Sequence, residues 1–341
     1  MTDGLMRLYG ALGSPYSMKM RAILRYRRLP HLWVQMRADT PNVFAKVKAP
    51  VIPVLEYADG TAMNDSTPLL YDLEQRFPDH RSIVPTDEAQ AFLAFLLEDM
   101  ADEWATKLMF HHRWYLKRDQ DQCSRWIIFD RMMGLGKEAI EGTAKAIRDR
   151  QVGRMAMVGC TPQNAPLIEE TGRQIFALLN DQIPQIPFLF GTRPSLADFS
   201  WYGQLSQNAV DPTAADLMRD TAPYLFRWML NIDDLGGWEG GEWHDPDLAP
   251  TPAAMGLLKL AGSVYFPFLQ ANEQAIARGE ETFSFKALGH GYSQGVFKYQ
   301  VKCLTALRQA YGALSADAKA KVDPVATACG FLDALKTGPA T

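Results

Sequence analysis

The sequence predicts an α/β domain at the amino-terminal end of the chain, followed by an all-α part. Short alternating apolar segments bounded by glycine or proline are confined to residues 1–85. From residue 87 onward, the apolar residues recur at helical spacing. A length of 341 residues also fits about two domains. We therefore expect domains over residues 1–85 and 86–235, and a helical extension over 236–341 that packs on the second domain.

A strand, a helix and a second strand are predicted first. Met6–Tyr9 alternates in polarity and runs into a glycine-containing loop. Ser14 and Pro15 resemble a helix N-cap with proline at the first helical position. The apolar stripe of this helix contains Met20, Ile23 and Leu24, while Lys19, Arg21 and Arg25 fall largely off it. His31–Met36 is the next predicted strand, and the helical connection favours parallel pairing.

Two more strands and a helix complete the first domain. Val51–Tyr57 is a predicted strand, and the turn at 58–60 leads into a short strand at Thr61–Met63. Asp65 and Ser66 then begin a helix that stops near Pro78. The predicted order is thus β-α-β followed by β-β-α. In the extension, helices are expected over three segments: Met255–Ala277, Gly295–Tyr311 and Ser315–Leu335.

The composition excludes several classes of protein. Hydrophobic residues make up 47% of the chain and charged residues 22%, which is too apolar for a disordered protein. A net charge of −4 argues against a nucleic-acid-binding surface or a polybasic membrane anchor. We find neither an uncharged apolar run of the ~20 residues that a membrane span needs nor a secretory signal. The four cysteines are far apart, which favours free thiols, so we expect a cytoplasmic protein.

Pro53 lies inside a predicted strand, where it removes a ladder hydrogen bond. It is either an edge-strand proline or part of a cis Ile52–Pro53 bond, which would turn the backbone of Ile52 outward to bind an extended peptide. Ser14 likewise has two interpretations, a plain N-cap or a hydroxyl donor at a helix N-terminus.

Together these features resemble the glutathione transferases, with their thioredoxin-like N-terminal domain and helical C-terminal domain. The resemblance covers about residues 5–230. It depends on the β-α-β/β-β-α order and on four short segments: Ser14–Ser17, Ile52–Leu55, Asp65–Ser66, and Phe188–Gly191 with Pro194–Phe199. Ser14 and Ser17 stand where the glutaredoxin motif has cysteines, which disfavours a glutathione-dependent disulfide reductase. Ser195 and Asp198 fit the helix-capping box of the family's second domain, a structural role.

The resemblance implies a glutathione site. Ser14, or alternatively Ser17, would donate to the thiol of glutathione, the co-substrate. Ile52 and Pro53 would hold the cysteinyl backbone, and Asp65 and Ser66 the ammonium and carboxylate of the γ-glutamyl head. Lys48, with Lys46, would bind the glycyl carboxylate, unless both are solvated surface lysines. Pro50 and Val51 replace the Gly-x that often precedes this step in the family, so the approach loop is expected to differ.

The second domain offers weaker signals. A wall of the pocket for the electrophile would include Tyr16, Met109, Trp114 and Tyr115, for which the alternative is a place in the core. The acids between Glu98 and Glu103 predict a salt-bridge network with Arg113, and their spacing to His111 and His112 fits no compact metal site, so no metal is expected. Cys160 is expected to be a bystander. The Gly289–Tyr292 segment fits no dinucleotide fingerprint.

Two functions remain open at this point. The first is a glutathione transferase-type enzyme that joins glutathione to a small hydrophobic electrophile. The second is a non-catalytic binding or scaffolding protein with the same fold. Retention of Ser14, Asp65 and Ser66 favours the enzyme, because a scaffold need not keep all three. A homodimer is expected by resemblance, unless the extension occupies the partner surface.

Overall fold

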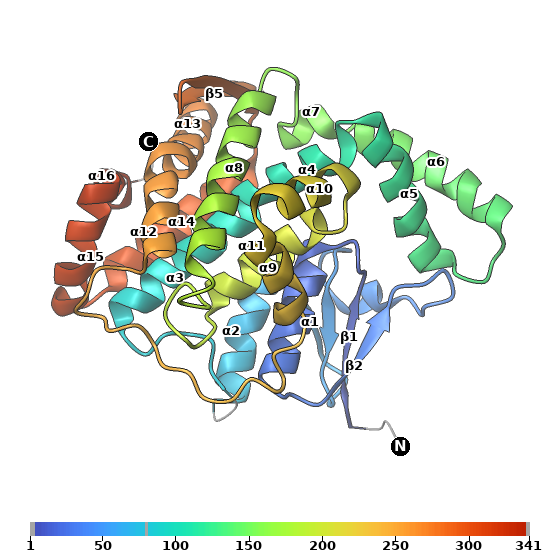
Figure 1. The fold of residues 1–341 in the computed structure, drawn as a ribbon, viewed down its shortest axis with the longest axis horizontal. Coiled ribbons are helices and arrows are strands. Elements are labelled where there is room, and N and C mark those ends of the chain that lie inside the picture. Colours follow the sequence, from blue (N-terminus) through green and yellow to red (C-terminus); the bar gives the residue numbers. More distant parts are fainter. Residues whose placement is uncertain (1–3, 79–80, 339–341) are drawn as a thin grey trace.

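The computed structural model describes residues 4–78 and 81–338 (Figure 1). The amino-terminal domain contains a four-stranded sheet in the order β2-β1-β3-β4. As predicted, β1 (Met6–Gly10) pairs in parallel with β2 (His31–Gln35), and β3 (Val54–Glu56) lies antiparallel to β1 and to β4 (Ala62–Asn64). Helices α1 (Pro15–Tyr26) and α2 (Ser66–Arg76) lie between this sheet and the helical part (Figure 1), and a short 3₁₀ helix spans Val43–Lys46.

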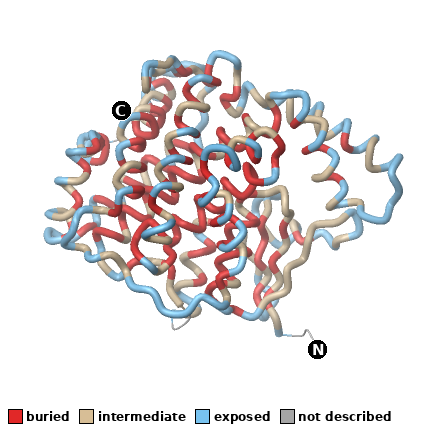
Figure 2. Tube along the Cα trace, in the orientation of Figure 1, coloured by how far each residue is buried: buried red, intermediate tan, exposed pale blue. Residues whose placement is uncertain are grey.

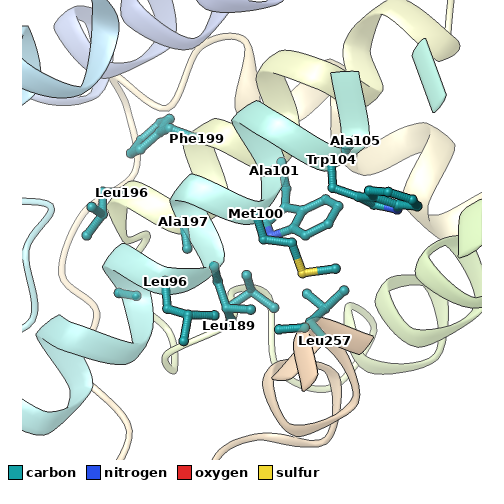
Figure 3. Close-up of a cluster of buried hydrophobic side chains, with 14 of the residues drawn as sticks. Leu96, Met100, Ala101, Trp104, Ala105, Leu189, Leu196, Ala197, Phe199 and Leu257 are labelled. Carbon is teal, nitrogen blue, oxygen red and sulfur yellow. The ribbon is translucent and has the colours of Figure 1, made fainter. Parts of the chain in front are cut away.

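The helical part is built around a central helix, α9 (Leu196–Asn208), in which every residue is buried. Its predicted capping box is confirmed, since the Ser195 N–H and hydroxyl both donate to Asp198 Oδ2, at 2.8 and 2.6 Å. A continuous helix packs beside it and consists of α3 (Glu88–Met100), the π-helical turn η2 (Ala101–Ala105) and α4 (Thr106–Trp114). Figure 3 shows apolar side chains of these two helices meeting Leu189 and Leu257. Further helices of this part are α8 (Ala165–Gln182), α10 (Pro212–Thr221) and α11 (Pro223–Ile232).

A helical hairpin projects from this body beside the sheet (Figure 1). It consists of α5 (Lys117–Met132) and α6 (Lys137–Val152), followed by the short α7 (Met155–Val158). Far fewer of its residues are buried than in the body (Figure 2). The end of α5 is tied to the first domain, because Gln35 Nε2 donates to the Asp130 carbonyl at 3.0 Å and the Ala38 N–H donates to the Arg131 carbonyl at 3.1 Å.

The carboxyl-terminal extension contains a β-hairpin that the sequence reasoning missed. Strands β5 (Thr282–Ala287) and β6 (His290–Gly295) pair around a two-residue turn in which Leu288 and Gly289 have φ values of 48° and 79°. Because Gly295 belongs to this hairpin, the next helix begins at Lys298 and not at Gly295. The helices of the extension are α12 (Pro252–Leu260), the π turn η3 (Ala261–Tyr265), α13 (Phe266–Ala277), α14 (Lys298–Ala313), α15 (Ala316–Cys329) and α16 (Leu332–Lys336).

The continuous helix Pro252–Ala277 is long and apolar enough, by length and composition, to cross a membrane. In the structure most of it is buried, and it packs on α8, α3 and α15. Burial against other helices is the pattern of a core helix, and the apolar composition serves that packing.

Candidate active site

Three segments meet at one end of the sheet. Tyr9 pairs with Val54, which in turn pairs with Asn64, so the end of β1, the start of β3 and the end of β4 lie in one row. The chain leaves or enters the sheet there at each of the amino-terminal candidate positions: Ser14 after β1, Ile52–Pro53 before β3, and Asp65–Ser66 after β4. The strand register therefore brings together residues that are up to 52 positions apart.

Ser14 caps the N-terminus of α1. Its Oγ accepts from the Ser17 N–H at 3.3 Å, and the residue is half-buried. The loop before it is held by the helical part, because Arg113 Nη1 donates to the Gly13 carbonyl at 2.9 Å and Gln207 Nε2 donates to the Leu12 carbonyl at 3.1 Å. Both interpretations of Ser14 stay compatible, since an N-cap hydroxyl can still donate its own proton to a ligand.

Ser17 is packed inside the protein, and the Tyr16 hydroxyl is engaged in an internal hydrogen bond. Ser17 is fully buried, and a Cβ added to Gly10 would lie only 2.8 Å from its Oγ. Tyr16 is half-buried, and its hydroxyl donates to the Asp102 carbonyl at 3.0 Å. Of the two serines that the sequence analysis named, Ser14 is the one with surface left for a ligand.

The Ile52–Pro53 peptide bond is cis. Pro53 is buried, whereas Val51, two residues earlier, is 50% exposed. Asn64 fixes the approach loop, because its Nδ2 donates to the Ala49 carbonyl at 2.7 Å and to the Val51 carbonyl at 3.2 Å. Lys48 lies exposed on this loop. Its neighbour Lys46 is paired with Glu56 at 2.5 Å and is therefore engaged within the protein.

Asp65 and Ser66 differ in their exposure to solvent. Asp65 has φ 76° and ψ 113°, an uncommon conformation for a residue other than glycine, and its side chain makes no capping hydrogen bond. The residue is exposed, so the carboxylate is available to a cation. Ser66 is buried at the first position of α2, and its Oγ lies 3.4 Å from Asp102 Oδ2 and 3.5 Å from Lys19 Nζ.

A buried group of charges underlies Ser66. Lys19 Nζ contacts Glu98 Oε1 at 2.5 Å and Asp102 Oδ2 at 2.7 Å, and Lys19 and Glu98 are fully buried. Burial alone would lower the pKa of Lys19, but Asp102 and Glu98 outweigh it and the pKa is raised. Burial raises the pKa of Asp102 to about 6 against the opposing effect of Lys19. This group links α1, α2 and the second domain.

The predicted network between these acids and Arg113 is wrong. Arg113 binds Asp211, Gln207 and the Gly13 carbonyl instead, with its Nε 2.8 Å from Asp211 Oδ2. Ten residues of helix separate Glu103 from Arg113, about 15 Å at 1.5 Å per residue, which is beyond the reach of one side chain. Among the described residues, no group of three or more His, Cys, Asp or Glu side chains is arranged to hold a metal ion.

Two cavities share Gln122 and Trp126 of α5, and one of them reaches the loop before Ser14 at Leu12. One has a volume of about 450 Å³ and includes Leu12 and Met18 of the first domain. The other has a volume of about 820 Å³, lies between α5 and α6, and includes Phe129 and Ile140. The Trp126 ring packs against this loop, since a Cβ added to Gly13 would lie 3.2 Å from the ring.

The residues predicted to line such a pocket are located elsewhere. Met109 and Trp114 are buried in the helical core, which was the alternative interpretation. Tyr115 stacks on His111, with ring centroids 4.5 Å apart, and lines a separate cavity of about 260 Å³. Sequence reasoning missed Trp126 and Phe129, and their helical spacing on α5 was the available signal. Cys160 is buried and its pKa is raised by burial to about 12, as suits a bystander.

Comparison with known families gives a match to the first domain. Residues 8–81 match the family model described as glutathione S-transferase, N-terminal domain. The first domain is therefore similar to the glutathione S-transferase N-terminal domain. The match ends before the helical part begins. A comparison with the curated proteins found no match.

Several solved structures are similar to the chain. A glutathione S-transferase from Methylobacterium radiotolerans, in complex with glutathione sulfonate, is 21% identical, with 67% of this chain and 90% of that chain covered and a TM-score of 0.42. A Tau class glutathione S-transferase from mango is 20% identical, with 69% and 91% covered and a TM-score of 0.42. The β-etherase LigF from Sphingobium sp. strain SYK-6 is 17% identical, with 67% and 94% covered and a TM-score of 0.46.

Proposed function

We propose that this protein binds glutathione at the end of the sheet and activates its thiolate for attack on a small apolar electrophile. The observation that carries the proposal is the meeting of Ser14, Ile52–Pro53 and Asp65–Ser66 in a domain that matches the glutathione S-transferase N-terminal model. Each segment offers one of the groups that a charged, thiol-bearing tripeptide requires.

Ser14 would stabilise the thiolate. A thiol with a pKa near 8.5 is only a few per cent ionised at pH 7, and the thiolate is the nucleophile. Lowering that pKa by two units requires about 2.7 kcal/mol of preference for the anion. A hydrogen bond to a charged group contributes about 1.5–3 kcal/mol and a helix N-terminus about 0.3–1 kcal/mol, so the hydroxyl and the start of α1 are sufficient together. The serine acts as a donor and is not itself the attacking group.

The remaining segments would hold the rest of the tripeptide. The exposed Asp65 carboxylate suits the γ-glutamyl ammonium, and the N–H and hydroxyl of Ser66 at the start of α2 suit the α-carboxylate. The backbone of Ile52 would pair with the cysteinyl backbone, and Lys48 is the exposed cation for the glycyl carboxylate. The apolar cavities at Trp126 are the proposed place for the electrophile.

Calorimetric titration with glutathione, combined with thiolate absorbance against pH, tests the proposal. We expect binding by the wild type and a bound thiol pKa about two units below 8.5. Ser14→Ala should still bind glutathione, but the pKa of the bound thiol should return most of the way to about 8.5. Ser17→Ala should leave the pKa of the bound thiol unchanged. Absence of binding at millimolar glutathione would refute the proposal and favour a scaffolding role. An unaltered thiol pKa in Ser14→Ala would remove the catalytic role from Ser14.

A further inference from the structure

A cavity of about 260 Å³ lies in the helical part, where α4 and α10 both pack against α8 (Figure 1). It shares no lining residue with the two cavities beside α5 or with the proposed glutathione site. Its ionisable groups are His111, His112 and Tyr115 at the end of α4, and Glu169 and Arg173 on α8. The proposed function leaves all of these groups unused, so they are available to a second ligand.

Both imidazoles of this cavity are neutral, as their hydrogen bonds indicate. His112 Nδ1 accepts from Asn208 Nδ2 at 2.8 Å, so the ring proton of His112 is on Nε2. His111 Nε2 donates to Glu169 Oε1 at 3.0 Å, and His111 Nδ1 is buried with no partner among the described residues. A second proton on His111 would create a buried N–H without an acceptor, which is unfavourable. Desolvation lowers the pKa of both histidines, that of His112 to about 3, in agreement with these bonds.

Glu169 therefore has a negative charge that its imidazole partner does not balance. Arg173, one turn further along α8, lines the same cavity, but its Nε and Nη2 both donate to Glu170 Oε2, at 3.3 and 2.8 Å. Two neighbouring carboxylates thus share one guanidinium, and one negative charge remains. The Glu169 side chain is 43% exposed, so this charge is accessible to a ligand in the cavity.

The surroundings of the cavity also favour a cation over an anion. Thr213, at the start of α10, lines the cavity, and its N–H and hydroxyl donate to the two carboxylate oxygens of Asp119 at 2.8 and 2.7 Å. Asp119 is fully buried, and both of these donors belong to an uncharged residue. The start of a helix would otherwise attract an anion, but here it is capped by a carboxylate. The end of α4 adds the negative end of a helix dipole.

We propose that this cavity binds a small organic ammonium ion, with the charged group at Glu169 and the apolar body against Tyr115 and Leu116. The Tyr115 ring is held by stacking on His111, with ring centroids 4.5 Å apart, and an aromatic ring within about 6 Å of a cation attracts it. The cavity is smaller than the roughly 300–1,000 Å³ of a drug-sized site, so the ligand is small. This inference goes beyond the proposed function and does not depend on it, since the two sites share no residue.

Benzylamine, which is a cation at pH 7, is the probe, and benzyl alcohol and benzoate carry the same ring with a neutral or negative group. In calorimetric titrations we expect the wild type to bind benzylamine with a Kd of about 1 mM or below, and benzyl alcohol and benzoate at least about tenfold more weakly. Glu169→Gln keeps an acceptor for His111 and removes the charge. It should raise the Kd for benzylamine about tenfold, or about 1.4 kcal/mol, to the value for benzyl alcohol. Asp181→Asn, at the far end of the same helix, is the matched control and should leave the Kd unchanged.

A third variant tests where the amine binds. Leu116 lines the cavity and is 46% exposed, so Leu116→Trp should occlude the cavity without disturbing the core and raise the Kd for benzylamine at least about fivefold. Saturating glutathione should leave the Kd for benzylamine unchanged. The inference is overturned if the wild type does not bind benzylamine at about 10 mM, if benzyl alcohol or benzoate binds as tightly, or if glutathione displaces the amine. An unchanged Kd in Glu169→Gln or in Leu116→Trp would overturn it as well.

Discussion

Replacing Lys19 with methionine should destabilise the protein strongly, because it removes the cation that lies between two buried carboxylates. Lys19 Nζ is 2.5 Å from Glu98 and 2.7 Å from Asp102, and both Lys19 and Glu98 are fully buried. Breaking a buried pair by removing one partner typically costs 3–5 kcal/mol, since the remaining charge is uncompensated. With two carboxylates left, we expect a loss of about 4 kcal/mol in the free energy of unfolding at pH 7.

The loss should depend on pH in a defined direction. In the folded protein the pKa of Asp102 is raised to about 6, above its value in the unfolded chain. The contribution of this group to the free energy of unfolding is therefore complete at a pH below the unfolded pKa, and it is lost as the pH rises through 6. Removal of Lys19 raises this pKa further, so Lys19→Met should be more destabilising at pH 7 than at pH 5.

Urea unfolding followed by tryptophan fluorescence at pH 5 and pH 7 measures both effects. Lys117→Met, whose side chain is 79% exposed in its pair with Asp121, is the control and should cost less than about 1 kcal/mol. Adding Glu98→Gln and Asp102→Asn to Lys19→Met should restore much of the stability. A loss below about 1 kcal/mol at pH 7, or an equal loss at both pH values, would refute the reasoning.

Two further substitutions test the core and the cavity. Asp198→Ala should lower the free energy of unfolding by about 3 kcal/mol. The reason is that the buried N–H groups of Leu189 and Ser195, each 2.8 Å from the carboxylate, lose their acceptor. A loss under about 1 kcal/mol in urea unfolding would contradict this. Trp126→Ala should raise the KM for an apolar electrophile at least fivefold in a steady-state assay and leave the Kd for glutathione unchanged. An equal loss of glutathione affinity would show that Trp126 supports the Gly13 loop instead.

The elements of the fold that could be predicted from the sequence are those specified by residues close together in the chain. Ser14 and Pro15 specify a helix start through backbone chemistry within four residues, and Ser195 with Asp198 do the same for α9. The β5–β6 hairpin was missed because Leu288 occupies a positive-φ turn position. A branched residue is rarely found there, so the Leu288–Gly289 pair gave no recognisable turn signal although Phe283 and Phe285 alternate as in a strand.

Sequence reasoning could name the candidate residues of the first domain, but it could not predict the charged contacts that this domain makes with the helical part. The reason is the way in which α1 is packed. Lys19 and Arg21 fall off the apolar stripe of α1, yet both are buried, because α1 is covered by β1 on one side and by α9 on another. A helix enclosed in this way keeps charged residues only where other elements supply partners, here Glu98, Asp102 and Asp233. Those partners are 79 or more positions away, so no local pattern identifies them. Buried charge on α1 therefore marks the interface between the two domains, and the proposed glutathione head group would bind directly above it.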